Sequence, residues 1–262
     1  MLCIETSGKS LGVALWGPQG LIDAAHVHDG ARHGAALAPM ILELLERTGL
    51  KVNRLGALGV SLGPGSWTGL RIGLAAAKAL AWGASLTLVG VPSLEALALA
   101  ALRPCGKEPT PGESPSPTQP LRVLVTVRHA YTEGLYVALW RETSKGPERL
   151  LSEQVLRPDS LPAAILEALN GLQLPAQAEV RLCGDAVCLK ALAEQASTRE
   201  WRVQPGFEEV PVVALAERAW ARLVAGASTP YVWRTPAEIH AAAPLYLRAS
   251  DPELKLKRKQ AS

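Results

Sequence analysis

Apolar and polar positions in the first hundred residues pass from the short alternation of strands to the spacing of helices. Three short apolar runs come first and are separated by glycine-rich turns, which predicts an antiparallel meander. Stretches with apolar residues at helical spacing then alternate with further short apolar runs. The expected strands are 2–6, 11–16, 21–28, 57–62 and 86–91, and the expected helices are 37–48, 67–83 and one that starts at residue 93.

The second half of the chain repeats this order. Three strands followed by alternating helices and strands, twice over, is the layout of the actin, sugar-kinase and chaperone-ATPase superfold. We therefore expect an α/β protein of two such subdomains that face each other across a cleft. The expected strands are 121–127, 135–140, 149–156 and 180–183, and the expected helices are 161–170, one that starts at 187, and 213–225.

A proline-rich stretch separates the two halves. Six prolines lie between residues 104 and 120 among glycine, serine, threonine and charged residues. Such a run forms neither a helix nor a strand ladder, so we expect an exposed, extended linker. The predicted organisation is a first subdomain at 1–103, the linker at 104–120, a second, diverged subdomain at 121–250 and a basic tail at 251–262.

Composition and charge narrow the class of protein. With 48% hydrophobic and 19% charged residues, the 262-residue chain is neither disordered nor a coiled coil. The tail, which contains Lys255–Lys259, carries +2 of the net charge of +3, so a broad basic surface for nucleic acid is not expected. No apolar stretch is long enough to span a membrane, there is no secretory leader, and four scattered cysteines form no C-x-x-C pair. We expect a cytoplasmic protein with buried thiols.

The glycine-rich run from residue 63 to 74, GPGSWTGLRIGL, is the most informative segment of the chain. A loop that leads into a helix N-terminus can bind an anion, although the run matches neither the Walker A pattern nor G-x-G-x-x-G. On spacing alone we favour a tight structural turn, with Ser66 or Thr68 capping the helix. Glu5, at the end of the first strand, lies where this superfold usually has an acid that organises metal or water, and Asp185, after the strand 180–183, lies at the mirrored place in the second half. The structural alternatives, which we favour, are a turn residue at Glu5 and a helix cap at Asp185. The candidate nucleotide or anion residues are Glu5, Gly63, Gly65, Ser66, Thr68 and Asp185.

Two neighbouring helices carry more apolar and small residues than one core contact needs. Gly69, Gly73, Ala77 and Ala81 recur at every fourth position of the helix 67–83. The two glycines lower helix propensity, which favours a close approach of another segment as the reason for the small residues. Either both helices are enclosed within their own domain, or they present a shared surface to a partner. The candidate interface residues are Leu37, Met40, Ile41, Leu44, Leu45, Gly69, Ile72, Gly73, Ala76, Ala77 and Leu80.

No catalytic centre can be assembled from the sequence. His26 and His28 share one strand face without a third ligand nearby, so we expect no metal site. Ser66 has no base close in sequence, and the G-x-S-x-G elbow of hydrolases is absent. We therefore name no catalytic residue, and a peptidase, which would depend on Ser66, is only weakly supported.

Several motifs together resemble the TsaB (YeaZ) family. They are the start Leu2-Cys3-Ile4-Glu5-Thr6-Ser7, the pair Arg32-His33, the Gly63–Leu74 run, which is highly specific, and Pro244-Leu245-Tyr246-Leu247-Arg248. The resemblance covers 1–103 well and 121–250 loosely. Two departures are Glu5 in place of the family's usual Asp, and Val127-Arg128-His129-Ala130-Tyr131 in place of its Asp-Ala-Arg motif, which weakens the case for a nucleotide site.

The resemblance implies a non-catalytic scaffold subunit of the bacterial machinery that adds threonylcarbamoyl to adenosine beside the anticodon of tRNAs reading A-starting codons. Such a subunit pairs with the catalytic TsaD through its first two helices, and the assembly includes the ATPase TsaE, uses ATP and Mg²⁺, and reaches tRNA as a complex. It binds no cofactor firmly itself, and the unpaired helices allow a homodimer when the chain is isolated. The alternative is an independent ATP-dependent enzyme of the same superfold that uses Glu5, Ser66 and Asp185 around Mg·ATP.

Overall fold

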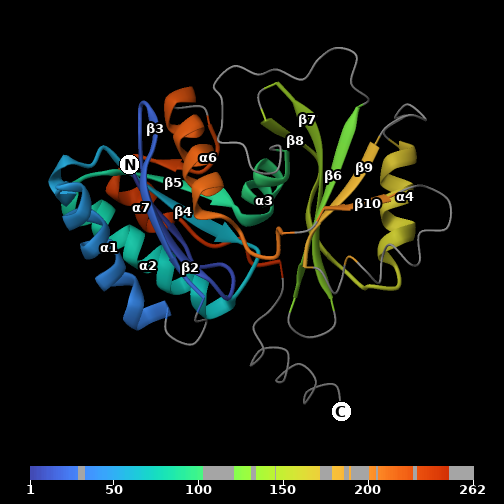
Figure 1. The fold of residues 1–262 in the computed structure, drawn as a ribbon, viewed down its shortest axis with the longest axis horizontal. Coiled ribbons are helices and arrows are strands. Elements are labelled where there is room, and N and C mark those ends of the chain that lie inside the picture. Colours follow the sequence, from blue (N-terminus) through green and yellow to red (C-terminus); the bar gives the residue numbers. More distant parts are fainter. Residues whose placement is uncertain are drawn as a thin grey trace.

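The structure is a computed structural model in which two β-sheets stand side by side with a helix between them (Figure 1). It describes residues 1–28, 33–102, 121–130, 134–144, 146–171, 179–185, 189, 201–204, 206–226 and 229–247. The predicted linker at 104–120, the basic tail at 251–262 and the start of the helix expected at 187 lie outside the described residues, as do Arg32, Tyr131 and Arg248.

The first sheet is built from the N-terminal half of the chain and one short strand from its end. Three antiparallel strands form the predicted meander, and parallel pairing of the first strand with the fourth continues the sheet. The sheet order is β11-β5-β4-β1-β2-β3. The strands are β1 (Leu2–Glu5), β2 (Leu11–Gly17), β3 (Gly20–Val27), β4 (Ala57–Gly63), β5 (Thr87–Pro92) and β11 (Val232–Trp233).

The second sheet repeats the meander and then adds parallel strands, in the order β10-β9-β6-β7-β8. Helix α4 (Leu161–Gly171) covers one of its faces through the buried Leu161, Ile165 and Leu169. The two-subdomain α/β fold predicted from the sequence is confirmed. The strands are β6 (Arg122–His129), β7 (Leu135–Thr143), β8 (Gly146–Leu156), β9 (Glu179–Gly184) and β10 (Trp201–Gln204).

Helix α3 (Ser93–Leu102) joins the two sheets (Figure 1). Its residues Leu94, Leu97, Ala98 and Ala101 share one apolar core with side chains of the second sheet, including Trp140. Nearly every residue of the helix is buried, because it has sheet structure on both sides. Removing this apolar surface from water is what holds the halves together.

The two faces of the first sheet are covered by helices from opposite ends of the chain. Helices α1 (His33–Thr48) and α2 (Trp67–Ala84) pack on one face, and α6 (Val212–Ala225) packs on the other (Figure 1). A short 3-10 turn, η1 (Val52–Arg54), lies between α1 and β4. Helix α7 (Pro236–Ala241) contacts α2. The packing therefore departs from the predicted subdomain 121–250, because α6, β11 and α7 complete the first half. Periodicity shows which face of α6 is apolar but not which sheet that face will cover.

Local details also differ from expectation or extend it. Helix α1 begins at His33, four residues before the predicted start, so Pro39 lies inside the helix rather than in its first turn.

Burial raises the pKa of both Cys3 and Cys183 to about 12, as expected for enclosed thiols, whereas Cys105 and Cys188 lie outside the described residues. Within the described part of the chain, no helix combines the length and the apolar character that crossing a membrane requires.

Candidate functional site

The buried carboxylate of Glu5 lies at the end of β1, where the chain turns toward β2. Its Oε1 accepts a hydrogen bond from the Ser7 amide at 2.5 Å, while its Oε2 is buried without a hydrogen-bond partner. Burial raises the pKa of the Glu5 carboxyl, against the opposing effects of Ser7, the Arg128 charge and Ser61. Glu5 is therefore more than a turn residue, because its side chain is enclosed between the strand ends.

The glycine-rich loop lies directly on the turn that follows Glu5. The Ser66 amide donates to the carbonyl of Ser7 at 2.7 Å, and the Ser66 hydroxyl caps α2 by accepting from the Gly69 amide at 3.2 Å. A Cβ at Gly65 would overlap the backbone of Ser7. The predicted residues Glu5, Gly65 and Ser66 are thus brought together, with Gly63 buried before the loop and Thr68 exposed in the first turn of α2.

Two residues from the second half of the chain close over this turn. The guanidinium of Arg128, at the end of β6, donates to the Ser7 hydroxyl at 2.8 Å. It also pairs with Glu209 at 3.6 Å, and both carboxylate oxygens of Glu209 lie 3.2 Å from the Lys9 amide, from which they accept. A Cβ at Gly8 would overlap the Glu209 carboxylate. The chain's own carboxylate therefore occupies the backbone donor of the β1–β2 turn.

These contacts bear on whether the residues around Glu5 fit a nucleotide. Backbone amides at a turn or helix N-terminus are the donors that a phosphate would use, and here Glu209 takes the amide of Lys9 while Ser66 takes that of Gly69. Asp185, which follows β9, has its amide bonded to the carbonyl of Val127 at 3.1 Å. The residues present do not fit a bound nucleotide phosphate unless Glu209 moves away. Among the described residues, no three histidine, cysteine or acidic side chains gather to hold a metal ion.

We expect Glu5 to make stability depend on pH. The unfolded chain ionises this carboxyl near about 4.3, whereas the folded protein keeps its proton to higher pH. Between these two pKa values the folded state binds more protons, so the free energy of unfolding falls as pH rises and stays lowered above the folded pKa. The Glu5→Gln variant lacks this proton, so its stability relative to wild type should increase from pH 4 to pH 8 in urea unfolding. A constant difference across that range would contradict the raised pKa.

Most candidate interface residues turn out to be core residues of the first half. On α1, Leu37, Met40, Ile41, Leu44 and Leu45 are buried under the first sheet. On α2, Gly69, Gly73 and Ala77 are also buried. A Cβ at Gly69 would overlap the Thr6 carbonyl oxygen, and one at Gly73 would overlap the Thr6 hydroxyl. The small residues admit the end of β1 rather than a partner's helices, and only Ile72, Ala76 and Leu80 of the set remain half-exposed.

Part of the outward face of each helix is nonetheless apolar, beside the exposed charges Glu43, Glu46 and Arg47 of α1. Along α2, the solvent-facing positions include Arg71, Ala75, Ala79 and Trp82, with Trp82 60% exposed. Arg71 lies over the ring of Trp67, 4.3 Å from its centroid, and its Nε donates to the Tyr246 hydroxyl. The outward face of α1 adds Ala35, Ala38, Pro39 and Leu42, the last of which is 59% exposed. We call these eight helix positions, Ala35, Ala38, Pro39, Leu42, Arg71, Ala75, Ala79 and Trp82, the helical face.

Sequence reasoning missed Arg128 and Glu209 as partners, because no motif links positions so far apart. It noted the segment that contains Arg128 only as a departure from a family pattern. Glu209 lies in a short acidic pair that has no recognisable spacing to any other group. The available signal was an arginine that follows a mostly apolar run in strand β6, since a buried charge needs a partner.

Comparison with known sequences places the similarity in the N-terminal half. A family model described as TsaD, tRNA N6-adenosine threonylcarbamoyltransferase, matches residues 29–116. The "tRNA threonylcarbamoyladenosine biosynthesis protein TsaB" of Escherichia coli (strain K12) is 36% identical over 106 residues, which cover 40% of this chain and 46% of that protein. The protein of the same name from Haemophilus influenzae is 38% identical over 103 residues, 38% of this chain and 42% of its own length.

A solved structure extends the match in fold over most of the chain. The structure of an uncharacterised Pseudomonas aeruginosa protein with similarity to peptidase YEAZ superposes with a TM-score of 0.69. It covers 94% of this chain and 98% of its own, at 21% identity. These comparisons support the resemblance of this chain to the TsaB (YeaZ) family. The sequence match to curated TsaB proteins spans less than half of their length, while the likeness to the YeaZ structure shows the fold alone. The segment that the TsaD family model matches contains α1 and α2.

Proposed function

We propose that this chain is a non-catalytic subunit in the biosynthesis of threonylcarbamoyladenosine on tRNA, and that it pairs with a TsaD-type enzyme through the helical face. The observation that carries the proposal is the row of exposed small and aromatic residues on α2, from Arg71 to Trp82. Small residues at Ala75 and Ala79 let another helix approach closely, while Trp82 and the stacked Trp67 and Arg71 provide the residue types that dominate interface energies.

The region matched by the TsaD family model supports the choice of partner. Residues 29–116 contain both α1 and α2, so a TsaD-type protein has a counterpart of this segment. Two related helix pairs can meet around an approximate two-fold axis, as in isologous dimers. The same symmetry would allow two copies of this chain to associate through the helical face when no partner is present.

The contacts around Glu5 support a subunit without its own chemistry. Glu209 and Arg128 satisfy groups that a phosphate would otherwise use, and Glu5 is enclosed with its proton held to higher pH. In the proposed assembly the TsaD-type subunit supplies catalysis, a TsaE-like ATPase and ATP with Mg²⁺ act on the complex, and tRNA binds to the whole. This setting is the cytoplasm.

We expect Ala79→Glu to abolish or greatly weaken this pairing. The substitution places a charge in the middle of the helical face, where burial against a partner would cost its hydration. Because Ala79 is exposed, the free chain should fold as wild type. The measurement is the dissociation constant with the TsaD-type enzyme by isothermal titration calorimetry, with an expected weakening of roughly a hundredfold or more, together with circular dichroism of the variant.

The matched control is Ala163→Glu, an exposed alanine on α4 in the other half of the molecule. It should leave the dissociation constant unchanged. Equal binding by Ala79→Glu and wild type would refute the helical face as the interface. Tight Mg·ATP binding with turnover by the isolated chain would instead favour the independent ATP-dependent enzyme.

A further inference from the structure

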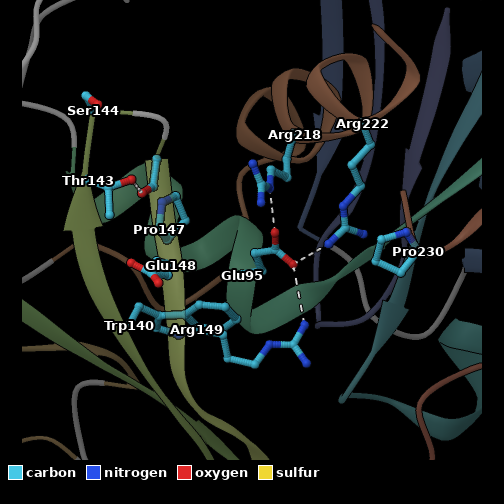
Figure 2. Close-up of a pocket in the computed structure, with 11 residues that line it drawn as sticks. Glu95, Trp140, Thr143, Ser144, Pro147, Glu148, Arg149, Arg218, Arg222 and Pro230 are labelled. Carbon is cyan, nitrogen blue, oxygen red and sulfur yellow. Dashed lines mark hydrogen bonds and ion pairs between the residues drawn. The ribbon is translucent and has the colours of Figure 1, made fainter. Parts of the chain in front are cut away.

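An open pocket of about 660 Å³ lies between the β7–β8 hairpin and the helices α3 and α6 (Figure 2). Its walls therefore come from both halves of the molecule. None of the residues Glu5, Ser7, Arg128 and Glu209 lines it, so it is separate from the residues clustered around Glu5. It is also separate from the helical face, because no residue of α1 or α2 contributes to it.

The floor of the pocket is one buried carboxylate that faces three guanidinium groups. Glu95 is only 3% exposed. Its Oε1 accepts from Arg218 Nε at 2.5 Å, its Oε2 accepts from Arg222 at 2.6 Å, and Arg149 lies 4.0 Å away (Figure 2). Arg218 and Arg222 come from α6 and Arg149 from β8, so the carboxylate joins three elements.

The three guanidinium groups have more N–H donors than the Glu95 carboxylate can accept, and Glu148, a further carboxylate that lines the pocket, pairs with Arg141. A guanidinium has five N–H donors, whereas a carboxylate accepts about four hydrogen bonds in all. Arg222 is fully enclosed, since it also donates to the Gly90 carbonyl and lies beside the Tyr231 ring. Arg218 uses only its Nε in the bonds described, and it is 24% exposed. Its terminal nitrogens are therefore available to a ligand.

Arg149 is the second available cation and belongs to the other half of the molecule. It is 35% exposed, pairs with Glu153 at 3.2 Å and lies over the Trp140 ring at 5.6 Å from the centroid. The indole and the Glu153 pair hold the guanidinium in place, which reduces the entropy lost when it binds a further group. Arg149 and Arg218 thus face one cavity from opposite halves.

We propose that this pocket binds a small polyanion, one that carries phosphate or carboxylate groups, bridged between Arg149 and Arg218. Guanidinium groups bind both kinds of oxyanion in a bidentate manner, and the cavity has room for a small molecule. Because the two arginines belong to different halves, a bound anion adds a tie between β8 and α6. Binding should therefore stabilise the whole fold as well as occupy the pocket.

The test is calorimetric titration of the full chain with pyrophosphate and, separately, with citrate at physiological ionic strength. We expect saturable binding of at least one of them, with the stronger identifying the ligand class, and a higher unfolding temperature in its presence. Arg149→Gln and Arg218→Gln should each weaken binding roughly tenfold or more, since each removes charge-assisted hydrogen bonds. Arg47→Gln, which removes an exposed cation on α1, should bind as wild type.

Arg149→Gln is the more informative variant, because Arg149 lies at the edge of the Glu95 cluster and its loss leaves Arg218 and Arg222 paired. Circular dichroism and thermal unfolding without anion establish that each variant is folded. The proposal is overturned if neither anion binds wild type with saturation, or if Arg149→Gln binds the anion as tightly as wild type.

Discussion

Glu95→Ala is expected to lower the free energy of unfolding by about 3–5 kcal/mol, the range found when one partner of a buried ion pair is removed. Burial lowers the pKa of Arg222, and the Glu95 charge opposes that effect, so the variant would leave a buried cation without its counter-ion. Arg218 would lose its carboxylate partner at the same time. Urea unfolding of the variant and wild type measures the difference.

The matched control is Glu148→Ala on the rim of the same pocket. Glu148 pairs with Arg141 at 2.7 Å, but both side chains are largely exposed, so the expected loss is at most about 1 kcal/mol. Similar losses of unfolding free energy for the two variants would contradict a central role for Glu95 in the buried ion-pair cluster with Arg218 and Arg222. The Glu95→Gln variant, which keeps the shape and removes the charge, should fall between alanine and wild type.

Gly69→Ala is expected to destabilise the fold by about 2–3 kcal/mol or to prevent folding. The added methyl group would overlap the Thr6 carbonyl oxygen, which belongs to the backbone at the end of β1. Backbone enclosed in a core cannot retreat cheaply, so the cost exceeds the gain in helix propensity from replacing glycine. The measurement is the denaturant midpoint and the unfolding free energy derived from it.

Gly83→Ala provides the opposite outcome within the same helix. No atom lies within 4 Å of a Cβ built at Gly83, which is exposed near the end of α2. This variant should be more stable than wild type by roughly 0.5–1 kcal/mol, because alanine loses less conformational freedom on folding. Two glycine-to-alanine changes with the same sign would contradict the close approach of β1 to Gly69.

Most of the elements could be predicted from the sequence because they depend on local pattern. The meander of β1 to β3 and its repeat in β6 to β8 follow from short apolar runs with turns between them. The Ser66 cap likewise depends on a hydroxyl placed before an apolar helical run. Both are decided within a few residues, so no knowledge of the distant chain is needed.

The small-residue stripe shows where local pattern ends. Four-residue spacing at Gly69 and Gly73 correctly indicates that something approaches the helix closely, but it does not say what approaches. In the structure, Thr6 of the same chain approaches Gly69 and Gly73. The exposed small residues are instead Ala75 and Ala79, which lie on a different face of the helix. Exposure depends on how α2 rotates against the sheet, which only the assembled core determines.

Pairs that are distant in sequence were beyond prediction for a related reason. Arg128 meets Glu209, and Glu95 meets Arg218 and Arg222, only after α6 has crossed back to the first sheet. A single sequence offers many arginines and acids, and charge alone does not select among them. The partners of these residues follow from the topology of the fold. The repeat of the two halves predicted that α6 belongs to the second half, whereas α6 packs on the first sheet.

That crossing has a consequence for how the protein is made. During synthesis from the N-terminus, β1 to β5 leave the ribosome long before α6 and β11. The face of the first sheet that α6 covers therefore stays exposed until α6 has been synthesised. The nascent chain thus exposes this apolar face from the synthesis of β5 until that of α6. A truncated transcript would yield an aggregation-prone product rather than a smaller working half.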